Sequence, residues 1–77
     1  MLITLNQLKL NQIGNVKKIN CNEKITRRLY DLGLLENTII SPIFSSPFGD
    51  PIAYEFRGNI IAIRNEDASK IFIEKQK

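Results

Sequence analysis

Histidine is absent from this 77-residue chain, and cysteine occurs only once, at Cys21. Histidine is the commonest metal ligand and the commonest general base at neutral pH, so both roles lose their usual side chain. One cysteine can form neither an internal disulfide nor a thiolate cluster with zinc-finger spacing. We therefore expect no tight metal site within one chain, while a site shared between two chains stays open.

Motifs for catalysis are missing as well. The chain has no Gly-x-x-x-x-Gly-Lys-Ser/Thr segment, which nucleotide-hydrolysing proteins use to hold phosphates. It also has no pairing of nucleophile and base at a known spacing, and no cofactor-binding loop. We expect a protein that is not an enzyme, with no catalytic residues and no cofactor.

Long hydrophobic runs are also missing. The apolar start of the chain is interrupted by Asn6, Gln7 and Lys9, and no basic segment precedes it, so it does not resemble a signal peptide. No run approaches the roughly 20 apolar residues that a membrane span needs. These features predict a cytoplasmic protein without direct membrane insertion.

Positive charge is present but not concentrated. Eleven Lys and Arg residues against eight Asp and Glu give a net charge of +3, and the only internal basic pairs are Lys17-Lys18 and Arg27-Arg28. Nucleic-acid-binding domains usually carry a basic stripe. We therefore expect no nucleic acid as a partner.

The composition is that of a folded domain. The chain is 43% hydrophobic and 25% charged, which is ordinary for a globular protein. A chain of this length has room for one small core. We expect a single domain over residues 1–77.

The first half of the chain predicts a helical turn, a strand and a helix. Thr4 and Gln7 have the spacing of a capping box for a short turn. Val16 and Ile19 are β-branched but three residues apart, which predicts a bulged strand. Asn22 is a good N-cap, and Gly33 suits the end of the helix that follows.

That helix carries a one-sided apolar stripe. Ile25, Leu29 and Leu32 recur at i, i+4 and i+7, the spacing of a buried helix face. On the opposite face, Asp31 is placed to form an ion pair with Arg27 or Arg28.

The second half predicts strands joined by turns. Strand-like segments cover residues 38–44, 52–56, 60–63 and 71–73, with Pro42 favouring an edge or a bulge. Gly58-Asn59 suits a two-residue hairpin turn, and Asn65 suits the N-cap of a short helical turn. Together with the first strand, these segments predict a mainly β protein, a small closed five-stranded barrel with one short helix.

Three sequence blocks carry a family resemblance when they are taken together. They are Arg-Leu-x-x-Leu-Gly-Leu at 28–34, Gly-Asp-Pro at 49–51, and Arg-Gly followed by Ala-x-Arg-x-x-x-Ala between 57 and 68. In this order they resemble the FeoA family, small cytosolic components of bacterial ferrous iron uptake systems. The resemblance implies an SH3-like barrel and an accessory role toward FeoB, the membrane protein that carries a GTPase domain and moves Fe(II). Asn11 and Asn37 stand where the family often has glycine.

The resemblance makes partner binding the expected function. The candidate contact residues are Phe48, Arg27, Arg28 and Arg57. Phe48 could cap one end of the barrel or stand exposed as an anchor, and both alternatives stay open. The arginines, including Arg64, could instead be a solvated helix face or cross-strand partners of Glu55 or Glu66.

Two further possibilities concern metal and self-association. Surface carboxylates could hold Fe(II) weakly, although their spacing matches no tight iron site. The alternative function is a metal-responsive regulatory domain, because similar barrels occur in iron-dependent repressors. Those repressors also need a DNA-binding helix-turn-helix and a dimerisation segment, for which this chain has no room. A homodimer through strand edges stays open.

Overall fold

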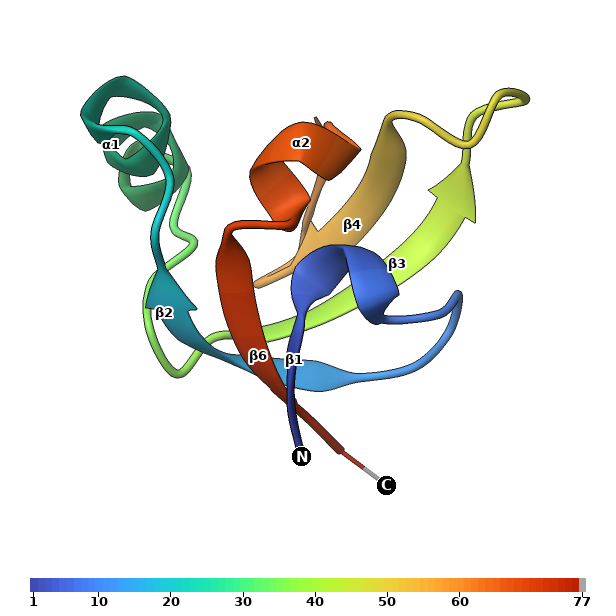
Figure 1. The fold of residues 1–77 in the computed structure, drawn as a ribbon, viewed down its shortest axis with the longest axis horizontal. Coiled ribbons are helices and arrows are strands. Elements are labelled where there is room, and N and C mark those ends of the chain that lie inside the picture. Colours follow the sequence, from blue (N-terminus) through green and yellow to red (C-terminus); the bar gives the residue numbers. More distant parts are fainter. Residues whose placement is uncertain (77) are drawn as a thin grey trace.

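The computed structural model describes residues 1–76, which form strands and three short helical segments (Figure 1). The strands are β1 Leu2–Thr4, β2 Gly14–Ile19, β3 Ile39–Ser45, β4 Ile52–Phe56, β5 Asn59–Ile63 and β6 Ile71–Lys75. The helical segments are the 3₁₀ turn η1 Leu5–Gln7, α1 Glu23–Asp31 and α2 Asn65–Ala68.

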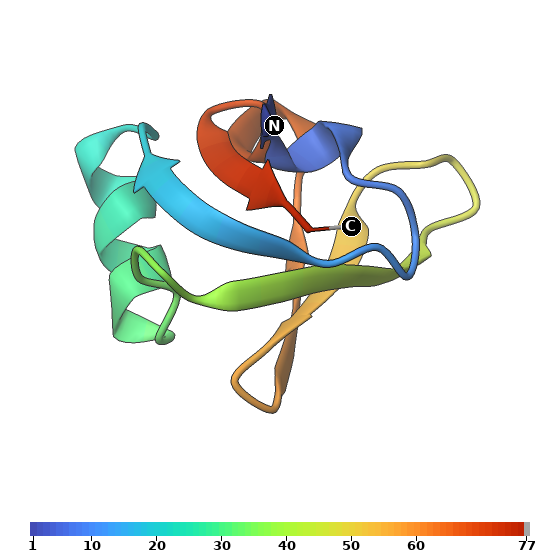
Figure 2. The same cartoon turned by 90° about the horizontal axis from the view of Figure 1, so that it is seen from below.

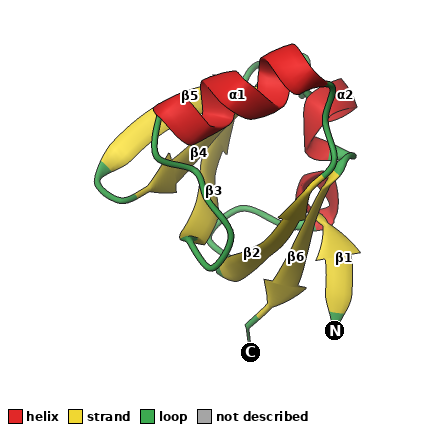
Figure 3. Ribbon diagram, turned by 90° about the vertical axis from the view of Figure 1, so that its left-hand side faces the viewer, coloured by secondary structure: helices red, strands yellow, loops and turns green. Residues whose placement is uncertain are grey.

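The strands form one antiparallel sheet in the order β1-β6-β2-β3-β4-β5. β2 and β3 pair only through Gly14 with Ile40 and Asn15 with Ile39, so the sheet can bend between its two halves. Figure 3 shows β1, β6 and β2 in one half and β3, β4 and β5 in the other. The mainly β, barrel-like fold is confirmed.

Two details of the predicted barrel are wrong. The sheet has six strands, because the short β1 adds to β6. The ladder is also not closed, since β1 and β5 do not pair with each other in the described part of the chain. β1 and β5 therefore each keep one free edge, and a free edge can pair with another chain.

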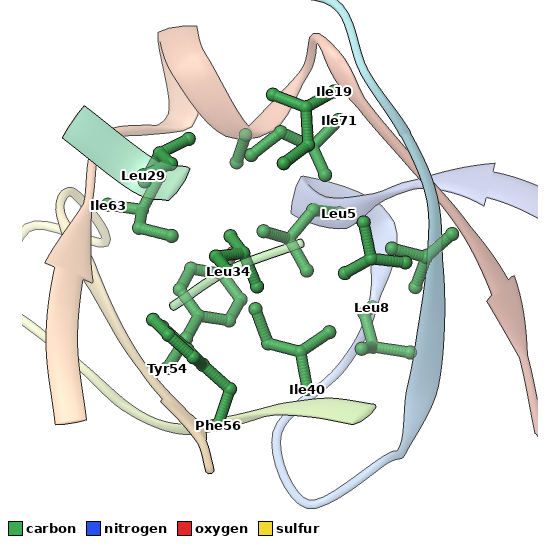
Figure 4. Packing of buried hydrophobic residues seen from close by; sticks show 13 residues of the cluster. Leu5, Leu8, Ile19, Leu29, Leu34, Ile40, Tyr54, Phe56, Ile63 and Ile71 are labelled. Atoms are coloured by element: carbon green, nitrogen blue, oxygen red, sulfur yellow. The ribbon is translucent and has the colours of Figure 1, made fainter. Parts of the chain in front are cut away.

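Side chains from both halves of the sheet meet in one core (Figure 4). Leu34, which follows α1, lies among residues of η1, β3 and β4 and is fully buried. The core residues are Leu5, Leu8, Val16, Ile19, Leu29, Leu34, Ile40, Tyr54, Phe56, Ile63, Ala68, Ile71 and Ile73. Because the bent sheet wraps this core, its outer face and its two edges are left for other contacts.

The ends of α1 are as predicted. The Asn22 side chain accepts a hydrogen bond of 2.8 Å from the Ile25 amide. At the other end the Leu34 amide donates to the Leu29 carbonyl and the Gly33 amide to the Tyr30 carbonyl, each at 2.9 Å. This is a Schellman arrangement, which requires the left-handed φ of +98° found at Gly33.

The predicted irregularities of the strands are also present. The pairing of β2 with β6 shifts between Val16 and Lys18, and that of β3 with β4 shifts between Pro42 and Phe44. Asn11 and Asn37 adopt left-handed φ values of 68° and 72°. Asparagine tolerates this region better than other residues with a Cβ, so it can replace glycine at both turns.

The β4–β5 turn lies one residue earlier than predicted. Phe56 pairs with Asn59, which makes Arg57 and Gly58 the two central residues instead of Gly58 and Asn59. Both central residues have positive φ, 52° and 79°, as a type I′ turn requires. The alternation of Ile61 and Ile63 could not distinguish the two registers, because both place these side chains inward.

The capping box predicted for Thr4 and Gln7 is present, and in it the Thr4 amide donates a hydrogen bond of 3.0 Å to the Gln7 side chain. The cap predicted for Asn65 is wrong. Asn65 begins α2 but does not cap it, since the residue before the helix is Arg64. The Asn65 amide instead donates to the Asp50 carboxylate at 2.9 Å. A distant loop therefore supplies the acceptor at this helix start.

Candidate interaction surfaces

The four predicted contact residues lie on different parts of the surface. Arg28 lines a groove between α1 and β5, whereas Arg27 lines a hollow on another side of α1, together with Cys21. Arg57 is in the β4–β5 turn and Phe48 in the β3–β4 loop. Figure 2 shows α1, this turn and this loop at three separate corners of the molecule. The four residues therefore do not form one continuous site.

The arginines have no acidic partners among residues 1–76. The one ion pair there joins the amino terminus of Met1 to Glu74. The predicted pairing of Asp31 with Arg27 or Arg28 is wrong. The open alternative that Arg57 and Arg64 pair with Glu55 or Glu66 is not found either. Exposed ion pairs contribute little and lose side-chain entropy, so close spacing alone does not form them. The exposed guanidinium groups are therefore available to acidic groups of a partner.

Phe48 does not cap the barrel, because its side chain is 96% exposed. Its loop, yellow in Figure 1, is nevertheless held at several points. The Gly49 amide donates to the Ser46 carbonyl at 2.9 Å, and the Asn65 side chain donates to the Gly49 carbonyl at 3.1 Å. The loop thus presents an exposed aromatic ring on an ordered backbone.

The groove between α1 and β5 has a volume of about 460 Å³. Its apolar walls are Ile25 and Leu29 of α1, Leu32 directly after α1, and Ile61 and Ile63 of β5, and its charged residues are Arg28, Arg64 and Asp67. Figure 3 shows α1 beside β5, and in Figure 4 the side chains of Leu29 and Ile63 lie near each other. The groove is therefore apolar inside and mainly basic in charge.

The sequence did not predict this groove. The stripe at 25, 29 and 32 has the spacing of a buried face, and Leu29 is indeed buried. Leu32, however, directly follows α1 and is 39% exposed at the groove. Periodicity identifies the apolar face of a helix but not what covers each of its residues.

Cys21 is half-buried, and its Sγ donates a weak hydrogen bond of 3.5 Å to the Asp67 carbonyl. Burial, and then the negative charge of Asp67, raise the pKa of the Cys21 thiol, while Lys70 acts in the opposite direction. In residues 1–76 no three His, Cys, Asp or Glu side chains gather where a metal ion could bind. Cys21 therefore belongs to no such group of three in the described residues, and the absence of a tight metal site stays a prediction.

Tyr54 is the most deeply buried titratable residue of the described chain. Its side chain is fully buried, and its hydroxyl finds no hydrogen-bond partner among residues 1–76. Burial, and then the charge of Asp50, raise the pKa of Tyr54 to about 12. The phenol is therefore neutral at physiological pH, and its role is to fill the core.

Tyr54→Phe is expected to leave stability at neutral pH unchanged or to raise it by up to about 1 kcal/mol, because it removes a buried hydroxyl without a partner. At acidic pH the effect of this substitution on stability should be the same as at neutral pH, because the phenol stays neutral. A folded pKa of about 12 lies above the ordinary value of 10.0, so stability from the neutral phenol is complete below pH 10 and falls as the pH rises toward 12. The variant should lose less stability over that range in urea unfolding.

Tyr30→Phe is the control for this prediction, because Tyr30 is exposed and donates a hydrogen bond of 2.9 Å to Glu36. The hydrogen bond to Glu36 also raises the pKa of Tyr30, but this tyrosine is exposed, so Tyr30→Phe should reduce the alkaline loss less than Tyr54→Phe does. A drop of more than about 1 kcal/mol for Tyr54→Phe at pH 7 would contradict the prediction, since it would mean that the hydroxyl is hydrogen-bonded.

None of the helices in residues 1–76 has the length and apolar character to cross a membrane.

The bent antiparallel sheet, the single core and the short α1 between β2 and β3 define a small SH3-like barrel. Family comparison identifies this barrel further, since the FeoA domain matches residues 3–75. The chain belongs to the FeoA family, as the sequence resemblance predicted.

Solved structures agree with this assignment. The FeoA protein of Chlorobium tepidum is 27% identical, with a TM-score of 0.93 over 97% of this chain and 71% of its own. A FeoA-like protein of Clostridium acetobutylicum is 30% identical, with a TM-score of 0.87 over 99% of this chain and 88% of its own. No match is found among curated proteins.

Two more distant structures share the fold alone. Stenotrophomonas maltophilia FeoA, solved with zinc, is 24% identical, with a TM-score of 0.77 over 94% of this chain and 89% of its own. It is described as a prokaryotic SH3 domain protein and a possible activating factor of ferrous iron transport. A manganese-dependent transcriptional repressor is 13% identical, with a TM-score of 0.86 over 97% of this chain and 42% of its own.

Proposed function

We propose that this protein is a cytoplasmic accessory protein of ferrous iron uptake that binds the cytosolic part of the FeoB transporter. The observation that carries the proposal is the match to the FeoA domain over residues 3–75, in a family associated with ferrous iron transport. The description of the Stenotrophomonas FeoA as a possible transport activating factor supports the same role.

The surface suits a binding role. Phe48 is an exposed aromatic residue in an ordered loop, and exposed aromatic side chains are common anchors of protein interfaces. Arg28 and Arg64 border an apolar groove. Neither arginine forms an ion pair within the described residues. A protein that acts by contact needs such surfaces and needs no catalytic centre.

Binding to the intact transporter tests the proposal. The full transporter in nanodiscs is immobilised and exposed to this chain without nucleotide, with GDP and with a non-hydrolysable GTP analogue. We expect saturable binding in at least one of these states, and competition by an excess of unlabelled chain. No saturable binding in any state would overturn the proposed function.

A metal-responsive regulatory domain is the second candidate, and the similarity of the fold to the manganese-dependent repressor favours it. Anaerobic titration with Fe(II), followed by calorimetry, distinguishes the two. Because no cluster of three metal-binding side chains exists in residues 1–76, we expect no stoichiometric saturation by the monomer. A saturable site with one Fe(II) per chain would favour the regulatory domain.

A further inference from the structure

β5 is an edge strand whose outer side is free. Within the described residues it pairs with β4 only. Because Phe56 and Asn59 close a two-residue turn, hydrogen-bonded pairs alternate with non-bonded pairs from there along the hairpin. Ile60 and Ala62 fall in the non-bonded pairs, so their amide and carbonyl groups point away from β4. These two residues can bond to an added strand.

This free edge borders the groove. Four successive residues, from Ile61 to Arg64, line it on one side, and α1 lines it on the other. Side chains of a strand alternate between its two faces, so a face alone would contribute only every second residue. Because four successive residues line the groove, the edge of the strand itself lies along it. A strand added to β5 would therefore lie between β5 and α1.

The apolar residues of the groove give such a strand something to bury. Ile61 is half-buried, and Leu32 is exposed over more than a third of its surface. An extended segment that pairs with β5 places alternate side chains toward these two residues. Main-chain bonds with alternate side-chain pockets are the usual basis of strand addition.

Charge selects the kind of segment. Arg64 follows β5 at one end and Arg57 precedes it at the other, and Arg28 faces the groove from α1. None of these arginines forms an ion pair within residues 1–76. Asp67 is the single acidic residue that lines the groove. The basic ends of β5 therefore suit a segment with acidic residues at its own ends.

The same charges disfavour a second copy of this chain as the occupant. Antiparallel pairing of two β5 strands would bring the Arg64 end of one copy beside the Arg57 end of the other. Like charges placed across a strand pair are destabilising. Acidic residues of a partner would be attracted to these arginines, whereas the arginines of a second copy would be repelled by them.

We propose that the free edge of β5 binds an extended segment of a partner protein, with alternating apolar residues between acidic ends, as an added strand in the groove beside α1. The proposal rests on the proposed function, that the protein acts by binding another protein, and adds which surface binds and which chemistry it selects. Carboxylates of the segment approach Arg28 and Arg64, and its apolar side chains pack on Leu32 and Ile61.

A peptide titration tests the groove directly. The probe is the capped peptide Asp-Val-Thr-Val-Thr-Val-Glu, added to ¹⁵N-labelled full-length chain, and the matched control peptide carries Lys at both ends. We expect saturable shifts of the Ile60 and Ala62 amides, with binding weaker by at least about tenfold for the Lys peptide. Equal binding of both peptides, or no saturable shift at these amides, would overturn the proposal.

Charge reversal of the groove gives a second test. The double variant Arg28→Glu with Arg64→Glu should bind the acidic peptide at least about tenfold more weakly and prefer the Lys peptide. Lys75→Glu, at the far end of β6, is the control with a changed charge outside the groove. An unchanged peptide preference in the double variant would contradict the proposal.

Ala62→Pro removes one outward amide without removing a bond to β4, because edge positions of this kind accept proline. If its amide spectrum stays folded, it should lose binding of the acidic peptide. A folded Ala62→Pro variant that binds normally would overturn strand addition. If that variant does not fold, the Arg28 and Arg64 double variant decides the question.

The transporter separates this proposal from the proposed function. Binding of the parent chain to the transporter, with equal binding of the charge-reversed variant, would support the function and overturn the groove as the contact. Failure of the parent chain to bind would overturn the function, and the peptide titration would then decide whether the groove takes an acidic strand. Self-association seen as concentration-dependent shifts at Ile60 and Ala62 would favour a second copy and contradict the proposal.

Discussion

Replacing Phe56 with alanine is expected to remove a large part of this protein's folding stability. The Phe56 side chain is almost fully buried and lies against Tyr54 in the core (Figure 4). Removing a buried phenylalanine ring typically costs about 3–5 kcal/mol, because transfer energy is lost and a cavity remains. A domain of this length is stable by only about 4–12 kcal/mol in total. Urea unfolding followed by circular dichroism measures the loss.

Phe48→Ala is the matched control, because it removes the same ring from an exposed position. It should change the unfolding free energy by no more than about 0.5 kcal/mol. Similar losses for the two variants would contradict the burial of Phe56 and the exposure of Phe48.

The same Phe48→Ala variant should bind the transporter roughly 30-fold more weakly, which corresponds to the loss of about 2 kcal/mol at an interface hot spot. The ring costs little entropy to immobilise on binding, because its loop is already tied to Asn65 through Gly49 and Asp50. Binding is measured with the full transporter in nanodiscs. Since stability should be unchanged, a weaker affinity reports the lost contact.

Phe44→Ala controls for the general effect of removing an exposed aromatic ring, since Phe44 lies on β3 and is also exposed. It should bind within about threefold of the parent protein, as most interface-neutral substitutions do. If Phe48→Ala binds as tightly as the parent, the loop is not an anchor. If Phe44→Ala instead abolishes binding to the transporter, the contact lies on the outer face of β3.

The helix α1 could be predicted closely because its signals are local. The Asn22 cap and the Gly33 stop act on amides and carbonyls within a few residues, so no distant contact was needed to place them. The same holds for Asn11 and Asn37, whose left-handed backbone follows from their own side chains. The family resemblance depended on the same short blocks.

Turns and caps that involve distant partners were predicted less well. The acceptor at the start of α2 comes from Asp50, fifteen residues earlier, and no local pattern indicates it. Arg57 takes a left-handed conformation that its side chain does not favour. Its Cδ lies 3.9 Å from where a Cβ on Gly33 would stand, so the Arg57 side chain extends from the turn toward the residue that ends α1.

The sequence by itself determined a small, mainly β domain with no histidine and one cysteine, and it identified the family. These conclusions depend on composition, periodicity and short motifs, which are properties of neighbouring residues. Only the tertiary structure decided that β5 keeps a free edge, that Arg28 and Arg64 border one groove, and that Phe48 stands in solvent. Those facts depend on how the sheet bends around its core, which brings residues far apart in sequence together.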